Sequence, residues 1–306
     1  MLCRTPFTRM KIEMEKLGDQ TIWSYFDNMS KARPAKNQDI RAGIGHPVSS
    51  YLELAKKIAE LQFRNRHHVL LFRGQKADYR TTKDNSMLKA SIFRLENSKV
   101  PDEHTLVKRF EMLRKAESLL SDRYEDQRLL GFDQLRKQRI IRWAVLQHYE
   151  VCPTPLLDVT HSLRIAASFA TIDNDCDEAF IFAFAVPNVS GAITASVEAG
   201  LQIVRLSSAC PPDAVRPHIQ EGYLLGEYPE ISDFSQHSKY DYYEMDFGRR
   251  LIAKFRFKPA TFWGNDNYPP ASKAALYPIE EGDPLSKIAA EVAQLISQEI
   301  QTDVSP

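Results

Sequence analysis

Apolar positions along the chain follow helical spacing in some stretches and extended spacing in others. Residues 51–66 carry apolar side chains at helical intervals directly after a serine pair, which predicts a capped helix. Residues 102–149 read as a long, mainly helical block of mixed charge with a break near Leu130 and Gly131. Residues 284–301 repeat the amphipathic pattern and predict a closing helix.

Four other stretches favour strands. Residues 69–72 form a short, wholly apolar run, and residues 201–206 are a further strand candidate. Residues 179–186 are apolar on both faces, which is typical of an internal strand. Residues 250–257 alternate between apolar and polar side chains, so we expect a half-exposed strand there. Helices early in the chain and strands later, with one helix between the strands, predict an α+β fold with a mixed sheet.

The N-terminal part is the least regular. Residues 21–29 suggest a short helix, and residues 30–47, with their Lys, Arg, Pro and Gly, suggest a loop or linker. We therefore expect residues 1–45 to form an extension or linker. Residues 46–300 are expected to form one domain, with residues 102–149 as a helical insertion.

Composition narrows the class of protein. Among the 306 residues, 40 Lys and Arg balance 40 Asp and Glu, so no general nucleic-acid or membrane surface is expected. The four cysteines lie far apart without metal-ligand spacing, which argues against a zinc site and a disulfide framework. The longest apolar run is too short for a bilayer and no secretory signal is visible, so we predict a cytoplasmic protein without a metal.

The stretch from Trp143 to Ala170 is the densest in candidate chemistry. Gln147, His148 and Tyr149 can all form hydrogen bonds, and Asp158, Thr160 and Ser162 share one side of an extended segment. A polar row leading into a buried helix is a frequent ligand site. The alternative is a capped helix with a satisfied aspartate.

Arg73 and Gly74 end the apolar run 69–72. An arginine at the edge of a core needs an acceptor, because an unpaired buried charge is costly. The acceptor is either a structural carboxylate such as Asp158 or a phosphate or carboxylate of a ligand held in a bidentate fork.

Several ordered motifs resemble the FRG domain family, named for the Phe-Arg-Gly motif that stands here at residues 72–74. The resemblance spans about residues 66–296. Its motifs are Gln75, the block LKASIFR at 88–94, the stretch 146–170, Arg216 with Gln220-Glu221-Gly222-Tyr223, and Leu276-Tyr277-Pro278. The sequence departs from the family at Glu150-Val151-Cys152, where glycine and one spacer are usual. It also departs at Ala90 (usually proline), Val159 (usually tryptophan) and Glu221 (usually glutamine).

The order of these motifs is also similar to the Arg–Ser/Thr–Glu arrangement of the ADP-ribosyltransferase fold. That resemblance implies an enzyme that uses NAD as its substrate and acts as a toxin or defence effector. It implies that Arg73 binds phosphate, that Thr160 and Ser162 orient the ligand, and that Glu221 is the catalytic carboxylate. The other cofactor-binding positions it implies are Gly74, Gln75, His148, Tyr149, Asp158, Phe169 and Gln220.

Two other functions stay open. One is a non-catalytic ligand-binding or interaction module, in which Arg73 and Asp158 form a buried pair and His148 is a satisfied core residue. The other is a hydrolase using His148, Asp158 and Glu221, which no metal-ligand spacing supports. The acceptor of an ADP-ribosyl group, whether macromolecule or small molecule, is not indicated by the sequence.

Overall fold

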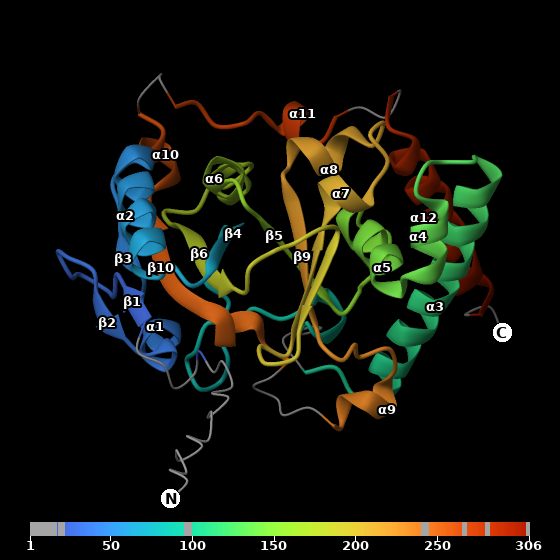
Figure 1. The fold of residues 1–306 in the computed structure, drawn as a ribbon, viewed down its shortest axis with the longest axis horizontal. Helices are drawn as coiled ribbons and strands as arrows, with labels where there is room; N and C mark the ends of the chain where they lie inside the picture. The colour runs from blue at the N-terminus through green and yellow to red at the C-terminus, as the bar shows by residue number, and fades with distance from the viewer. Residues whose placement is uncertain are drawn as a thin grey trace, which may run out of the picture.

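A computed structural model describes Leu17 and residues 22–94, 100–239, 245–264, 268–278 and 282–303. These residues form an α+β fold around an eight-stranded mixed sheet with the strand order β3-β10-β6-β4-β5-β9-β8-β7 (Figure 1). The sheet is antiparallel apart from the pairing of β3 with β10. A short hairpin of β1 and β2 lies beside it.

The strands are β1 (Ile22–Ser24), β2 (Arg33–Ala35), β3 (His46–Pro47), β4 (Val69–Gln75), β5 (Leu156–Thr160), β6 (Ala179–Val186), β7 (Ile193–Ser196), β8 (Leu201–Arg205), β9 (Gly222–Glu227) and β10 (Leu251–Phe257). The α-helices are α1 (Asn37–Ala42), α2 (Tyr51–Arg64), α3 (Glu103–Asp126), α4 (Phe132–Lys137), α5 (Arg139–His148), α6 (Leu163–Thr171), α7 (Leu206–Ala209), α8 (Val215–Ile219), α9 (Phe234–His237), α10 (Pro259–Phe262), α11 (Lys273–Leu276) and α12 (Pro284–Asp303). Two short 3-10 helices cover Ser91–Phe93 and Phe247–Arg250.

The helix predicted after the serine pair is confirmed as α2, and its first turn shows why it starts there. The Ser50 hydroxyl accepts a hydrogen bond from the Glu53 backbone N–H, and the Glu53 carboxylate accepts one from the Ser49 backbone N–H. The first bond satisfies a backbone donor that a helix start leaves unpaired, and the second ties Glu53 to the residue before the N-cap. Asp102 caps α3 as Ser50 caps α2, because its carboxylate accepts a hydrogen bond from the Thr105 N–H.

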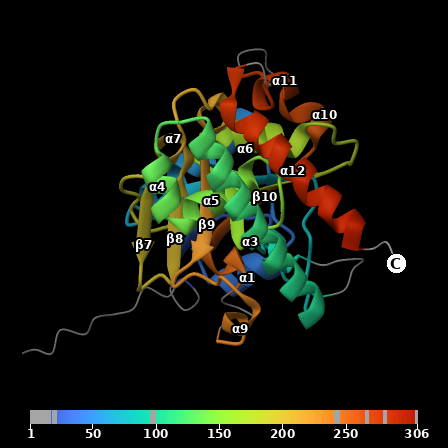
Figure 2. The same ribbon diagram turned by 90° about the vertical axis from the view of Figure 1, so that its right-hand side faces the viewer.

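The helical block 102–149 lies along one side of the molecule. Its helices α3, α4 and α5 gather with α12 on the right of Figure 1 and face the viewer in Figure 2. The predicted break is confirmed at Gly131, whose φ of +88° suits glycine and which precedes α4. A second break at Gln138 separates α4 from α5.

The sheet is divided into two parts between β4 and β5. These neighbours share the single register pair Phe72–Thr160, whereas β4 pairs with β6 along its whole length and β5 does the same with β9. Beyond Phe72 the edges of β4 and β5 therefore separate, with α6 packed against both strands. Two ladders that meet at one point leave polar strand edges facing each other.

The N-terminal part differs from the pattern-based expectation. The short helix expected over 21–29 is wrong, because residues 22–24 form strand β1, paired with β2. A nine-residue helix would gain little stability alone, while the hairpin is tied down by the Asn65 side chain, which bonds both backbone groups of Trp23. The loop expected over 30–47 contains β2, α1 and β3.

The half-exposed strand expected over 250–257 is also different in the structure. Strand β10 is buried along nearly all of its length, and the Lys254 side chain is 1% exposed. Alternation of charged and apolar residues indicates exposure only when the polar face meets water. Here α1 packs against β10 and supplies acceptors for Lys254.

Within the described residues, no helix is long and apolar enough to cross a membrane. The same residues hold no cluster of three His, Cys, Asp or Glu side chains that suits a metal ion. Cys152, Cys176 and Cys210 are free thiols.

Candidate functional site

A pocket of about 740 Å³ lies where β4 and β5 separate, and it is bounded by α6 and the start of β9. Its size falls in the range of small-molecule sites, roughly 300–1,000 Å³. Of the residues singled out from the sequence, Arg73, Gly74, Gln75, His148, Asp158, Thr160, Phe169 and Gln220 line it. Tyr149, Ser162 and Glu221 do not line it.

Gly74 allows a helix to approach β4 closely. A Cβ atom at this position would lie 1.8 Å from the Ala166 carbonyl oxygen and 3.0 Å from the Ala170 backbone nitrogen. The small residues of α6 and the absent side chain of Gly74 therefore belong to one contact. The glycine positions the pocket floor through packing, because any other residue would push α6 away from the strand.

Arg73 spans the gap between the two strands. Its Nη1 donates to the Asp158 carbonyl oxygen over 2.7 Å, while its buried Nε has no hydrogen-bond partner among the described residues. Among the described residues, Arg73 has no carboxylate within 4 Å. Burial and the neighbouring Arg94 lower the pKa of Arg73 to about 10, so it remains charged at neutral pH. The non-catalytic hypothesis required an ion pair between Arg73 and the Asp158 carboxylate. In the described structure Arg73 instead binds the backbone carbonyl of Asp158.

Arg94 brings a second guanidinium to the same pocket. Its Nε donates to the Lys89 carbonyl oxygen over 3.3 Å, and in the described structure it too meets no carboxylate within 4 Å. Burial lowers the pKa of Arg94. Lys76 and Lys89 also line the pocket, whose charge is therefore positive.

Asp158 lies on β5 with its carboxylate oriented by α5. Its Oδ2 accepts a hydrogen bond from Gln147 Nε2 over 2.7 Å. Gln147 is held in turn through its Oε1, which accepts from the hydroxyls of Ser91 at 2.6 Å and Thr154 at 2.7 Å. Burial raises the pKa of Asp158 above its usual range, and the nearby Arg73 and Arg94 oppose that rise.

His148 is neutral and partly unsatisfied. Its side chain is 5% exposed, and burial together with the positive Arg216 lowers its pKa to about 3. Its Nε2 is buried with no hydrogen-bond partner in the described structure. A neutral imidazole in a pocket wall offers an acceptor for a ligand group or a bound water.

Thr160 and Tyr149 have structural partners. The Thr160 hydroxyl bonds the carbonyl oxygens of Gln220 and Glu221 and accepts from the Ser162 N–H, so it joins β5, α6 and the turn before β9. The Tyr149 hydroxyl donates to Asp283 over 2.8 Å, away from the pocket. Ser162 begins α6 without a side-chain cap.

Glu221 lies outside the pocket lining. Its backbone has a φ of +45° and its side chain is exposed, while the preceding Gln220 is buried and donates to the Leu276 carbonyl oxygen. The left-handed backbone conformation at Glu221 therefore lies between a side chain that points inward, Gln220, and one that points to solvent, Glu221. The structure thus brings Arg73 and Thr160 together at the pocket but leaves the Glu221 carboxylate in solvent.

One wall of the pocket is aromatic, which the sequence pattern did not indicate. Tyr79, Tyr223 and Tyr277 line the pocket beside Phe169, whose ring packs edge-on against Tyr277 with centroids 6.1 Å apart. The tyrosines come from three distant segments, so spacing could not unite them. Arg94, Tyr223 and Tyr277 do lie inside the motifs that resemble the FRG family, so those motifs indicated them.

The comparison with protein families gives one match. The model of the FRG domain matches residues 68–179, a segment that runs from β4 to the start of β6 and supplies most of the pocket wall. No curated protein and no solved structure matches the chain.

Proposed function

This chain carries an FRG domain, and we propose that the pocket of this domain binds NAD through its phosphates, as part of an ADP-ribosyltransferase-like protein. The observation that supports the proposal is the pair Arg73 and Arg94, whose guanidinium groups meet no carboxylate within 4 Å among the described residues. Two guanidinium groups suit a pyrophosphate, because each can bind phosphate oxygens in a fork.

The pocket walls also suit the rings of a nucleotide. Aromatic side chains from four segments line the same pocket as the cations, and planar rings pack well on such surfaces. A pocket that combines several cations with aromatic faces fits a ligand with a charged centre and planar ends. NAD has that composition, with two rings joined through a pyrophosphate.

Transfer of ADP-ribose makes a further demand. The bond between nicotinamide and ribose breaks, nicotinamide leaves with the bonding electrons, and the acceptor attacks the positive ribose carbon while losing a proton. A carboxylate near the ribose stabilises that charge. Glu221, which the resemblance assigns to this task, is exposed outside the pocket. This placement favours a second candidate, a nucleotide-binding module without turnover.

NAD binding is tested first, by calorimetry on the full chain. We expect wild-type protein to bind NAD and Arg94→Met to bind at least about tenfold more weakly, since a charged hydrogen bond contributes about 1.5–3 kcal/mol. Arg136→Met removes an equal charge from the exposed end of α4 and should bind as wild type. Equal binding by both variants, or none by wild type, would contradict the proposal.

Turnover is tested separately with labelled NAD and cell lysate. Transfer of label or release of nicotinamide by wild type, lost in Arg94→Met, supports the enzyme. Loss in Glu221→Gln as well would assign the catalytic carboxylate to Glu221. Tight NAD binding without turnover would support the binding module. A role as a toxin or defence effector depends on turnover, since consumption of NAD or modification of a macromolecule would harm the cell.

A further inference from the structure

Asp158 is held in position with one oxygen left for a ligand. Two hydroxyls fix the carbonyl oxygen of the Gln147 side chain, so its NH₂ group must face Asp158 Oδ2. No other residue of the described structure donates a hydrogen bond to Oδ1, and Asp158 lines the pocket. Such support fixes the orientation of the carboxylate before any ligand arrives.

The other acidic side chains near the pocket are placed differently. Glu150 is 68% exposed and pairs with Arg216 over 2.9 Å. Glu221 is exposed and does not line the pocket. Within the described residues, Asp158 is therefore the pocket carboxylate that has no cation within 4 Å.

The surroundings of Asp158 define what it can bind. A carboxylate only accepts hydrogen bonds and repels phosphate, whereas Arg73 and Arg94 nearby attract phosphate. A ligand that presents both a phosphate and a hydroxyl a few bonds away satisfies all three residues. A ribosyl phosphate has this chemistry, because its sugar hydroxyls donate while its phosphate accepts.

We propose that Asp158 accepts a hydrogen bond from a ribose hydroxyl of the bound nucleotide. Asp158 would then occupy the place beside the ribose that the resemblance to the ADP-ribosyltransferase fold gives to Glu221. The inference rests on the proposed function, since it takes the nucleotide to lie in this pocket. Gln147 is a positioning residue for this contact, acting through Asp158.

The experiment compares AMP, 2′-deoxy-AMP and 3′-deoxy-AMP as ligands of the full chain, by calorimetric competition against NAD. We expect wild type to bind at least one deoxy form about tenfold more weakly than AMP, the value of a lost charge-assisted hydrogen bond. In Asp158→Asn the ratio should fall below about threefold. Inorganic pyrophosphate should bind Asp158→Asn at least as tightly as wild type, because a repelling charge is gone.

Two further variants complete the test. Glu221→Gln should keep the wild-type ratio, and Gln147→Leu should lower it. If Asp158→Asn does not fold by circular dichroism, Gln147→Leu carries the comparison. Equal binding of all three nucleotides by a wild type that binds NAD would overturn this inference alone, as would an unchanged ratio in a folded Asp158→Asn. Absence of NAD binding would overturn the proposed function with it.

Discussion

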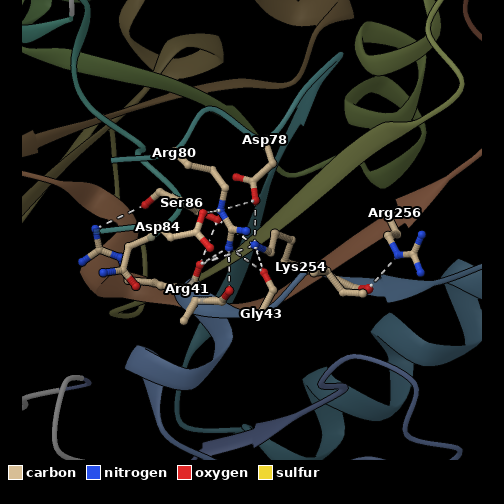
Figure 3. A network of polar contacts seen from close by, with 12 residues as sticks. Arg41, Gly43, Asp78, Arg80, Asp84, Ser86, Lys254 and Arg256 are labelled. Carbon is tan, nitrogen blue, oxygen red and sulfur yellow. Dashed lines mark hydrogen bonds and ion pairs between the residues drawn. The ribbon is translucent and has the colours of Figure 1, made fainter. Parts of the chain in front are cut away.

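Two positive side chains on either side of strand β6 are treated in opposite ways. Lys254 on β10 is 1% exposed, and its ammonium bonds Asp78 at 2.7 Å, Ser86 at 2.8 Å and the Gly43 carbonyl oxygen (Figure 3). Arg73 on β4 donates one hydrogen bond within the described structure and has a buried Nε without a partner. The first charge is neutralised by the fold, and the second remains available to a ligand.

The two regions are connected by the segment that follows β4. Asp78 and Ser86 bind Lys254, while Tyr79, Met87 and Lys89 of the same segment line the pocket. Lys254, whose ammonium has a full set of partners, therefore holds in place the segment that forms one wall of the pocket around Arg73. A cation with complete partners gives rigidity, and a cation without them gives affinity for an anion.

Removing the ammonium of Lys254 should have the largest effect on the free energy of unfolding. Lys254→Met should lower the free energy of unfolding by about 3 kcal/mol, because it removes the ammonium that pairs with the buried Asp78 carboxylate at 2.7 Å and leaves that carboxylate only the more distant Arg80 Nε at 3.6 Å among the described cations. Urea unfolding measures the change. Lys258→Met, at an exposed position just past β10, should stay within about 0.5 kcal/mol. A loss below about 1 kcal/mol for Lys254→Met would show that the network is dispensable.

Removing the guanidinium of Arg73 should do the opposite, with a large loss of NAD affinity and little change in stability. Arg73→Met should weaken NAD binding about 100-fold, a cost of about 2.7 kcal/mol. Its free energy of unfolding should be unchanged or up to about 1 kcal/mol higher, because a charge buried without a carboxylate is replaced by an apolar chain. Calorimetry and urea unfolding of the same preparation give both values. Strong destabilisation with unchanged affinity would make Arg73 a structural residue.

The neutral His148 should make stability depend on pH. Its pKa is lowered to about 3 from 6.5, so between these values the unfolded chain binds more protons than the folded one. Stability therefore rises with pH across this window, and about 2 kcal/mol is lost from pH 6.5 to pH 5. In urea unfolding, the His148→Gln variant should lose about 2 kcal/mol less of its free energy of unfolding than the wild type between pH 6.5 and pH 5. Parallel curves for the two proteins would contradict a buried neutral histidine.

The exposed ion pair at the pocket rim should have the smallest effect. Glu150 has a φ of +59°, a region that favours glycine, and its pair with Arg216 is solvated. Glu150→Gly should raise the free energy of unfolding by about 0.5 kcal/mol, because relief of backbone strain exceeds the loss of the exposed pair. Glu150→Ala loses the same pair and keeps the strain, so it should be about 1 kcal/mol less stable than the glycine variant.

The sequence predicted the parts of the fold that rest on local pattern. Helix α2 and strand β6 are confirmed because capping residues and apolar runs are properties of neighbouring residues. The hairpin of β1 and the buried β10 were missed, since each depends on partners far along the chain. The domain boundary near residue 45 stays a prediction, although Ile22, Tyr25 and Ile40 belong to the common core.

The site divides in the same way. By itself, the sequence determined the motifs, the α+β class, and the strand end that carries Arg73. Tertiary structure alone decided that β4 and β5 separate after Phe72 and that Glu221 turns to solvent while Asp158 faces the pocket. It also decided that Arg94 joins Arg73, with no carboxylate of the described residues within 4 Å of either guanidinium. The physical reason is that the charge balance of a pocket depends on which distant side chains share it, and a linear pattern contains no distances.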